Sequence, residues 1–215
     1  WMKNPDNRRV AVNFNADYNG VTLLNRIGND EPLVSSYLHH FFIKENTTKP
    51  YEPYIDDTYL KHTFAETKIV NGLGDAEQWY SMLPPAKYQA LKERVDIDFA
   101  YTNPQTFKAD EAVSVDLHVK NVKSLIVKVY EINTTNYYMQ NLTEVDTDIT
   151  LDGLVANDEQ TFEYDESPLR RVSRHFAFPE LTKPGVYVID FIGNGRNSRM
   201  LVRKGKLHFI ASNGP

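Results

Sequence analysis

The stretch VSVDLHVKNVKSLIVKVYEI, residues 113–132, alternates apolar and polar side chains twice in succession. The alternating apolar positions are Val113, Val115, Leu117 and Val119, then Leu125, Val127 and Val129. A period of two residues is typical of a half-buried β-strand. Asn121 lies between the two runs and marks a turn. The stretch therefore predicts two neighbouring strands that each turn one face toward a core.

The same alternation of apolar and polar side chains continues over residues 94–215. Further alternating pairs are Ile97 and Phe99, Ile149 and Leu151, Phe176 and Phe178, Val186 and Val188, Met200 and Val202, and Leu207 and Phe209. Turn signals separate them, among them Asp152-Gly153, Pro184-Gly185 and Gly193-Asn194-Gly195. About seven short strands without an intervening helical pattern favour an antiparallel β-sandwich.

Residues 1–93 have a different texture. Residues 50–93 are expected to form a helical linker or insertion, because Asp56 and Asp75 can cap helices and Pro84-Pro85 separates two of them. Residues 1–49 are expected to form a β segment with strands at 10–14, 21–24 and 37–43. This segment could be the end of a preceding sandwich domain. The opening Trp1-Met2 is interpreted as a cut from a longer chain.

Composition excludes several classes of function. The 215 residues include no Cys, so thiol catalysis, thiolate metal sites and disulfides are absent. A net charge of −5 gives no electrostatic footprint for nucleic acid, and no apolar run reaches the length of a transmembrane helix. A G-x-S-x-G elbow and a phosphate-binding Gly-rich loop are also missing. We therefore expect a protein that is not an enzyme.

Several motifs of residues 94–215 resemble a known family. They are the Pro104 and Phe107 turn with the acidic run ADEAVSVD at 109–116, the strand at 125–131, and FAFPELTKPGVYVI at 176–189. In this order they resemble a macroglobulin (MG) domain of the alpha-2-macroglobulin family, which is a fibronectin-like sandwich. The resemblance covers about 120 residues, and the Pro-Gly-x-Tyr corner within it is common to many sandwiches.

The resemblance implies a non-catalytic structural or interaction module of a large extracytoplasmic protein, secreted, periplasmic or at the cell surface. Its partners would be other domains of the same large chain, and proteases through the parent protein. The family's thioester needs a Cys, which this chain lacks, so the segment would act as scaffold. The fold expected for the whole chain is mainly β: an MG-like sandwich at 94–215, preceded by the helical segment and the N-terminal strands.

An alternative function is a calcium-dependent or aromatic binding module for glycan or protein. Asp148, Thr150, Asp152 and Glu159 have nearly the spacing of an EF-hand calcium loop, although no amphipathic helices flank them. Tyr137 and Tyr138 lie in a polar stretch and could form an exposed contact surface. Apart from this calcium, no cofactor is expected.

Two further patterns have both a functional and a structural interpretation. Residues 144–166 contain nine acidic and no basic side chains, and residues 170–206 contain nine Lys or Arg. These blocks either bind charged partners or neutralise each other on neighbouring strands. Tyr51, Tyr54 and Tyr59 are either a contact surface or ordinary core.

Overall fold

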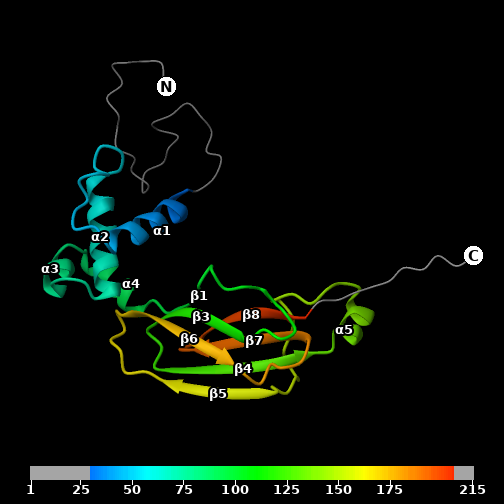
Figure 1. The fold of residues 1–215 in the computed structure, drawn as a ribbon. Helices are drawn as coiled ribbons and strands as arrows, with labels where there is room; N and C mark the ends of the chain where they lie inside the picture. Colours follow the sequence, from blue (N-terminus) through cyan, green and yellow to red (C-terminus); the bar gives the residue numbers. More distant parts are fainter. Residues whose placement is uncertain (1–29, 206–215) are drawn as a thin grey trace, which may run out of the picture. The chain divides into compact units, whose positions relative to one another are not determined.

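A computed structural model describes residues 30–205 of the chain (Figure 1). The chain divides into two compact units, Trp1–Glu93 and Arg94–Pro215. The first is helical in its described part and the second is mainly β. This confirms the coarse expectation of a mainly β architecture with helices ahead of it. The three-part domain division drawn from the sequence stays a prediction, and the strands proposed at 10–14 and 21–24 lie outside the described residues.

The described part of the helical unit, residues 30–93, contains four helices. They are α1 (Glu31–Phe42), α2 (Asp57–Asn71), α3 (Ala76–Ser81) and α4 (Pro85–Glu93). The predicted caps are confirmed: Asp56 accepts a hydrogen bond from the Tyr59 amide at 3.0 Å, and the Asp75 side chain caps α3. Gly72 ends α2 in the left-handed conformation, φ 62°, which a glycine adopts without steric cost.

The strand predicted at 37–43 is wrong, because these residues belong to α1 and the turn after it. The aromatic run favours a strand locally, but Pro32 and Glu31 suit a first helical turn. Val34, Leu38 and Phe42 then fall on one helical face, which packs against Tyr59, Leu60 and Phe64. Burial of this face decides in favour of the helix.

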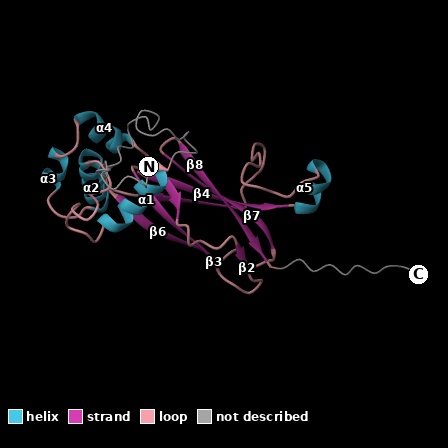
Figure 2. Cartoon of the chain, turned by 90° about the horizontal axis from the view of Figure 1, so that it is seen from above, coloured by secondary structure: helices cyan, strands magenta, loops and turns pink. Residues whose placement is uncertain are grey.

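Over residues 94–205 the second unit contains two sheets, whose strands are coloured magenta in Figure 2. One has the order β1-β3-β6, and the other has the order β2-β8-β7-β4-β5. The strands are β1 (Asp96–Phe99), β2 (Thr106–Phe107), β3 (Val113–Lys120), β4 (Ser124–Ile132), β5 (Asp158–Glu163), β6 (Arg171–Phe178), β7 (Gly185–Gly193) and β8 (Arg196–Lys204). All pairs are antiparallel except β2 with β8, so the second sheet is mixed rather than purely antiparallel.

One hydrophobic core lies between the two sheets, and both sheets contribute to it. The alternating residues of 113–119 and 125–129 point into this core as predicted. Phe191 is fully buried in β7, and its ring contacts Phe99 and Phe176 of the other sheet at centroid distances of 5.7 and 5.3 Å. These edge-to-face contacts connect the two sheets at the centre of the unit.

The turn chemistry read from the sequence is confirmed at two corners. The Tyr187 hydroxyl donates a hydrogen bond to the Lys183 carbonyl at 2.9 Å, which closes the Pro-Gly-x-Tyr corner before β7. Asn194 and Gly195 form the two-residue turn between β7 and β8, both with positive φ (45° and 76°). This turn fixes the β7–β8 register, in which Gly193 faces Arg196.

A long excursion, residues 133–157, separates β4 from β5 and contains α5 (Thr134–Asn141). Tyr137, Val145, Ile149 and Leu151 of this excursion pack on Tyr130, Val188 and Leu201, which belong to the sheet of β4, β7 and β8. The strand predicted at Ile149 and Leu151 is therefore wrong: both residues are buried, but in a loop. The expectation of a unit without a helix between its strands is wrong for the same reason.

Candidate functional site

The aromatic residues of the helical unit divide into a buried and an exposed set. Tyr59 is buried, and its hydroxyl donates a 2.6 Å hydrogen bond to Glu31; burial and this acceptor raise the Tyr59 pKa to about 12. Tyr51 is half-buried and donates to Glu45 at 2.9 Å, and burial raises its pKa above the ordinary value. Tyr54 is exposed. The tyrosines grouped by the sequence therefore do not share one environment.

Polar contacts fix α1 and the loop after it to α2. His39 Nδ1 lies 2.7 Å from the Thr67 hydroxyl, and the Lys68 ammonium donates to the Glu45 carbonyl at 2.8 Å. Lys68 also lies 5.0 Å from the centre of the Phe64 ring. Burial lowers the pKa of Lys68 below its ordinary value. These contacts hold α1 in one position on its support.

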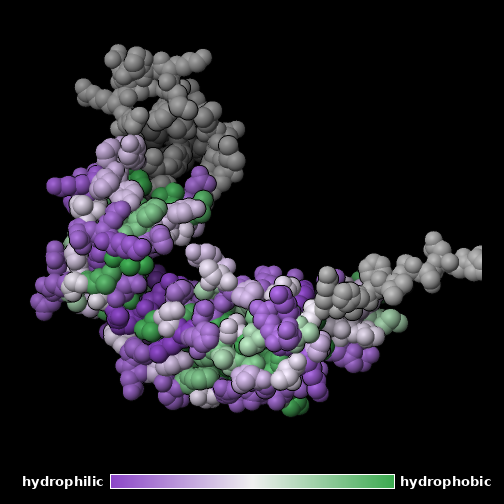
Figure 3. All heavy atoms as spheres, viewed as in Figure 1, coloured by the Kyte–Doolittle hydropathy of each residue, from purple (hydrophilic) through white to green (hydrophobic). Residues whose placement is uncertain are grey.

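The exposed face of α1 was missed by the sequence reasoning. Leu33, Tyr37 and Phe41 are large apolar side chains and all three are exposed, 60%, 58% and 42% respectively. Figure 3 shows hydrophobic residues, in green, at the surface of the helical unit. The spacing of four residues was a signal for this face, but the strand interpretation of residues 37–43 concealed it.

Tyr137 and Tyr138 lie together on α5 and have different surroundings. Tyr137 is half-buried against the hydrophobic cluster that the excursion forms with Tyr130 and Val188. Tyr138 is exposed and lines a groove of about 690 Å³. The groove's other walls include Ile132, Val186 and Arg203. The predicted contact role of Tyr137 and Tyr138 stays a prediction.

The proposed calcium ligands are distributed over a loop and a strand. Asp148, Thr150 and Asp152 are exposed in the excursion, while Glu159 lies on β5 and forms an ion pair with Lys128 of β4 at 3.2 Å. Within residues 30–205, no three His, Asp or Glu side chains gather in a way that could hold a metal ion. Calcium binding stays a prediction, without geometric support from these residues.

Several acidic and basic side chains from the two charge blocks pair with each other. Glu166 pairs with Arg174, and Glu144 lies 4.0 Å from Arg203. The Arg174 guanidinium lowers the pKa of Glu166 below its ordinary value. These contacts agree with the structural interpretation of the two blocks, in which the acidic and the basic side chains neutralise each other.

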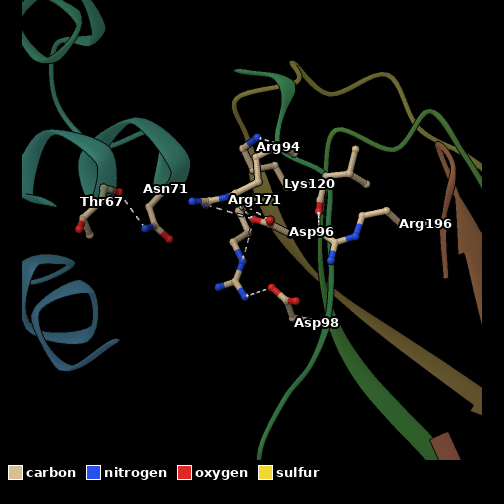
Figure 4. Close-up of polar contacts among 9 residues, drawn as sticks. Thr67, Asn71, Arg94, Asp96, Asp98, Lys120, Arg171 and Arg196 are labelled. Atoms are coloured by element: carbon tan, nitrogen blue, oxygen red, sulfur yellow. Dashed lines mark hydrogen bonds and ion pairs between the residues drawn. The ribbon is translucent and has the colours of Figure 1, made fainter. Parts of the chain in front are cut away.

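A second charged cluster lies at one end of the β1-β3-β6 sheet (Figure 4). Asp96 contacts Arg94 at 3.0 Å and Arg171 at 3.8 Å, and Arg171 also binds Asp98 at 2.9 Å. His118 on β3 has its pKa lowered by burial and by the Arg171 charge, against the opposing effect of Asp98 and Asp116. Asp96 and Asp98 already have arginine partners, so the cluster stabilises the sheet end.

Comparison with known proteins identifies relatives of both units. Residues 1–95 match the family model of the actin-binding protein F N-terminal domain, and residues 125–205 match that of the AbpF first immunoglobulin-like domain. Over 205 residues the chain is 42% identical to Actin-binding protein F of Dictyostelium discoideum. The alignment covers 94% of this chain and 9% of that relative.

These matches correct the expectations that followed from the macroglobulin resemblance. The alpha-2-macroglobulin assignment is wrong, because residues 125–205 match the family model of an immunoglobulin-like domain from a different protein. The extracytoplasmic location, the protease partners and the macroglobulin parent domains are wrong with it, since the aligned relative is named for binding actin. The physical cause is that the Pro-Gly-x-Tyr corner and apolar alternation reflect sandwich geometry rather than one family.

The prediction that the chain is not an enzyme is confirmed by the same matches, which describe an actin-binding protein with immunoglobulin-like domains. None of the helices within residues 30–205 is long and apolar enough to cross a membrane. In both of its units, the helical one and the β one, the chain is thus similar to actin-binding protein F.

Proposed function

We propose that this chain is a non-catalytic, actin-binding segment of a larger protein. The observation that carries the proposal is the 42% identity over 205 residues to a protein named for binding actin. The match extends over both units, so the proposal concerns the chain as a whole. An actin partner places the chain inside the cell, where actin filaments assemble.

In this proposal the helical unit contacts the partner and the β unit supports it. The helical unit presents large exposed apolar side chains on α1, which suits a protein contact. For the β unit we infer an immunoglobulin-like β-sandwich that serves as a rigid support. The shared core, the ring contacts between the sheets and the tyrosine corner support this inference.

Co-sedimentation with actin filaments tests the proposal. The 215-residue chain is mixed with increasing amounts of filaments, and the fraction in the pellet is measured. We expect saturable binding with a Kd in the range of about 1–100 μM, which is common for a single module of a larger protein. A chain that stays in the supernatant at filament concentrations of roughly 100 μM would refute the proposal. The folded chain centrifuged without filaments is the control for non-specific pelleting.

A further inference from the structure

Helix α1 has two apolar stripes rather than one. The inner stripe is Val34, Leu38 and Phe42, and the outer stripe is Leu33, Tyr37 and Phe41. Each has a spacing of four residues, so its members lie one above the other along the helix. The two stripes are offset by one residue, about 100° around the helix axis. A helix that is apolar on two faces needs two partners.

The inner stripe has its partner within the unit. Leu38 and Phe42 are buried, and the Phe42 ring lies edge-on to Phe64 of α2 at 5.0 Å. The outer stripe remains exposed in the structure, although it consists of one aliphatic and two aromatic side chains. Exposed contiguous apolar surface of this kind marks an interaction site more often than scattered single side chains do.

The outer stripe is also ordered in advance of any contact. The ring of Phe41 stacks between Tyr37 and Tyr51, with centroid distances of 6.4 Å to each and interplanar angles of 20° and 23°. Tyr51 is itself held by its hydrogen bond to Glu45. Aromatic side chains already fixed in place lose little conformational entropy on binding, and Tyr is enriched among residues that dominate interface energies.

We propose that the outer stripe of α1, extended by Tyr51, is the surface on which actin docks. This inference rests on the proposed function, and it assigns that function to one helix face. The stripe lies within residues 1–95, which match the N-terminal domain of actin-binding protein F. The three side chains span about 12 Å along the helix, at a rise of 1.5 Å per residue, and would enter an apolar groove of the partner.

The second unit offers two exposed apolar side chains that serve as the matched control. Met139 on α5 and Tyr101 in the loop after β1 are 73% and 97% exposed, so they provide one aliphatic and one aromatic side chain outside α1. The test variant is Leu33→Ser with Tyr37→Ser, and the control variant is Met139→Ser with Tyr101→Ser. Both pairs remove exposed apolar area of the same kind from the intact 215-residue chain.

Co-sedimentation with actin filaments and thermal unfolding are measured for the chain and both variants. We expect the α1 pair to weaken actin binding at least tenfold while its melting temperature falls by less than about 15 °C, because both side chains are partly exposed. The control pair should bind within twofold of the parent. Binding of the parent should also change less than threefold between about 50 and 300 mM salt, because the contact is apolar rather than ionic.

Each other outcome decides against one of the two ideas. If the parent chain does not co-sediment, the proposed function fails and the docking surface fails with it. If the parent binds and the α1 pair binds within twofold of it, actin binding stands and the α1 surface is refuted. If the α1 pair lowers the melting temperature by more than about 15 °C, or converts a dimeric parent to a monomer that still binds actin, the stripe is covered by this chain itself and not by actin.

Discussion

The adjacent residues Phe41 and Phe42 allow a sharp test of the two-stripe description of α1. Phe42 is fully buried, with ring contacts to Phe64 at 5.0 Å and Tyr51 at 5.5 Å, whereas Phe41 is 42% exposed on the outer stripe. Phe42→Ala removes a buried ring and leaves a cavity, which costs about 4 kcal/mol. Phe41→Ala loses only a half-exposed ring, so we expect a cost of about 1 kcal/mol or less.

These free energies translate into clear shifts of the melting temperature. A unit of 93 residues has a total stability of about 5–14 kcal/mol, and each kcal/mol corresponds to roughly 4–8 °C. Phe42→Ala should therefore lower the melting temperature of the helical unit by roughly 15–30 °C. Phe41→Ala should lower it by less than about 8 °C.

The assay is thermal unfolding followed by circular dichroism at 222 nm, where the helical unit contributes most of the signal. Equal losses for the two variants would refute the reasoning, because the outer stripe would then be packed as tightly as the inner one.

Three further predictions concern the β unit. Asp190 is 4% exposed and pairs with Arg199 at 3.3 Å. Arg199→Met should therefore lower the free energy of unfolding in urea by about 3 kcal/mol, and adding Asp190→Leu should restore most of it. No recovery in the double variant would contradict the pairing. The pKa of His118 is lowered in the folded chain, so the unfolded chain binds the His118 proton first as pH falls. The contribution of neutral His118 to the stability of the fold is therefore complete above about pH 6.5 and is lost as pH falls below that value. His118→Gln should flatten the dependence of stability on pH in this range, and an unchanged slope would contradict the prediction. Millimolar calcium should leave the melting temperature unchanged within about 1 °C, whereas a rise of several degrees that Asp152→Ala abolishes would establish the calcium loop.

Local signals predicted the parts of the fold that depend on local chemistry. The strands around 113–119 and 125–129 were predictable because one face of each is buried, and the Asp56 and Asp75 caps were predictable because their side chains satisfy nearby amides. The tyrosine corner and the Asn194-Gly195 turn follow from residues with special backbone or hydrogen-bonding properties.

The errors arose where tertiary packing overrides local preference. Residues 37–43 are rich in strand-forming aromatics, but contact with α2 selects a helix. Ile149 and Leu151 alternate like a strand, yet they are buried as a loop on the outside of a sheet. β5 was missed because its sequence, DEQTFE, has almost no apolar face: it is an exposed edge strand.

The candidate site was predictable only in part. Tyr51 was left open between a contact surface and ordinary core, and it stacks on Phe41 of the outer stripe while also packing against the core of the helical unit. Leu33, Tyr37 and Phe41 needed the helix to be recognised first. The macroglobulin assignment failed for a different reason: a corner that many sandwiches share describes geometry, and only the comparison of whole domains separates the families.

A pulling force along the chain would load the parallel β2–β8 pair in shear. β1 precedes β2 and is paired with β3, and β8 is the last described strand of the unit. Once β1 has separated from β3, tension at the two ends would draw the parallel strands β2 and β8 past each other. The amides of Arg203 and Gly205 donate to the carbonyls of Gln105 and Phe107 at 3.1 and 2.8 Å, and both bonds would bear the load together rather than open one after the other. We expect single-molecule stretching to show a distinct rupture of the β unit; gradual extension without a force peak would contradict it. A filament-bound protein with this connection would resist tension through a short parallel strand pair whose hydrogen bonds include these two.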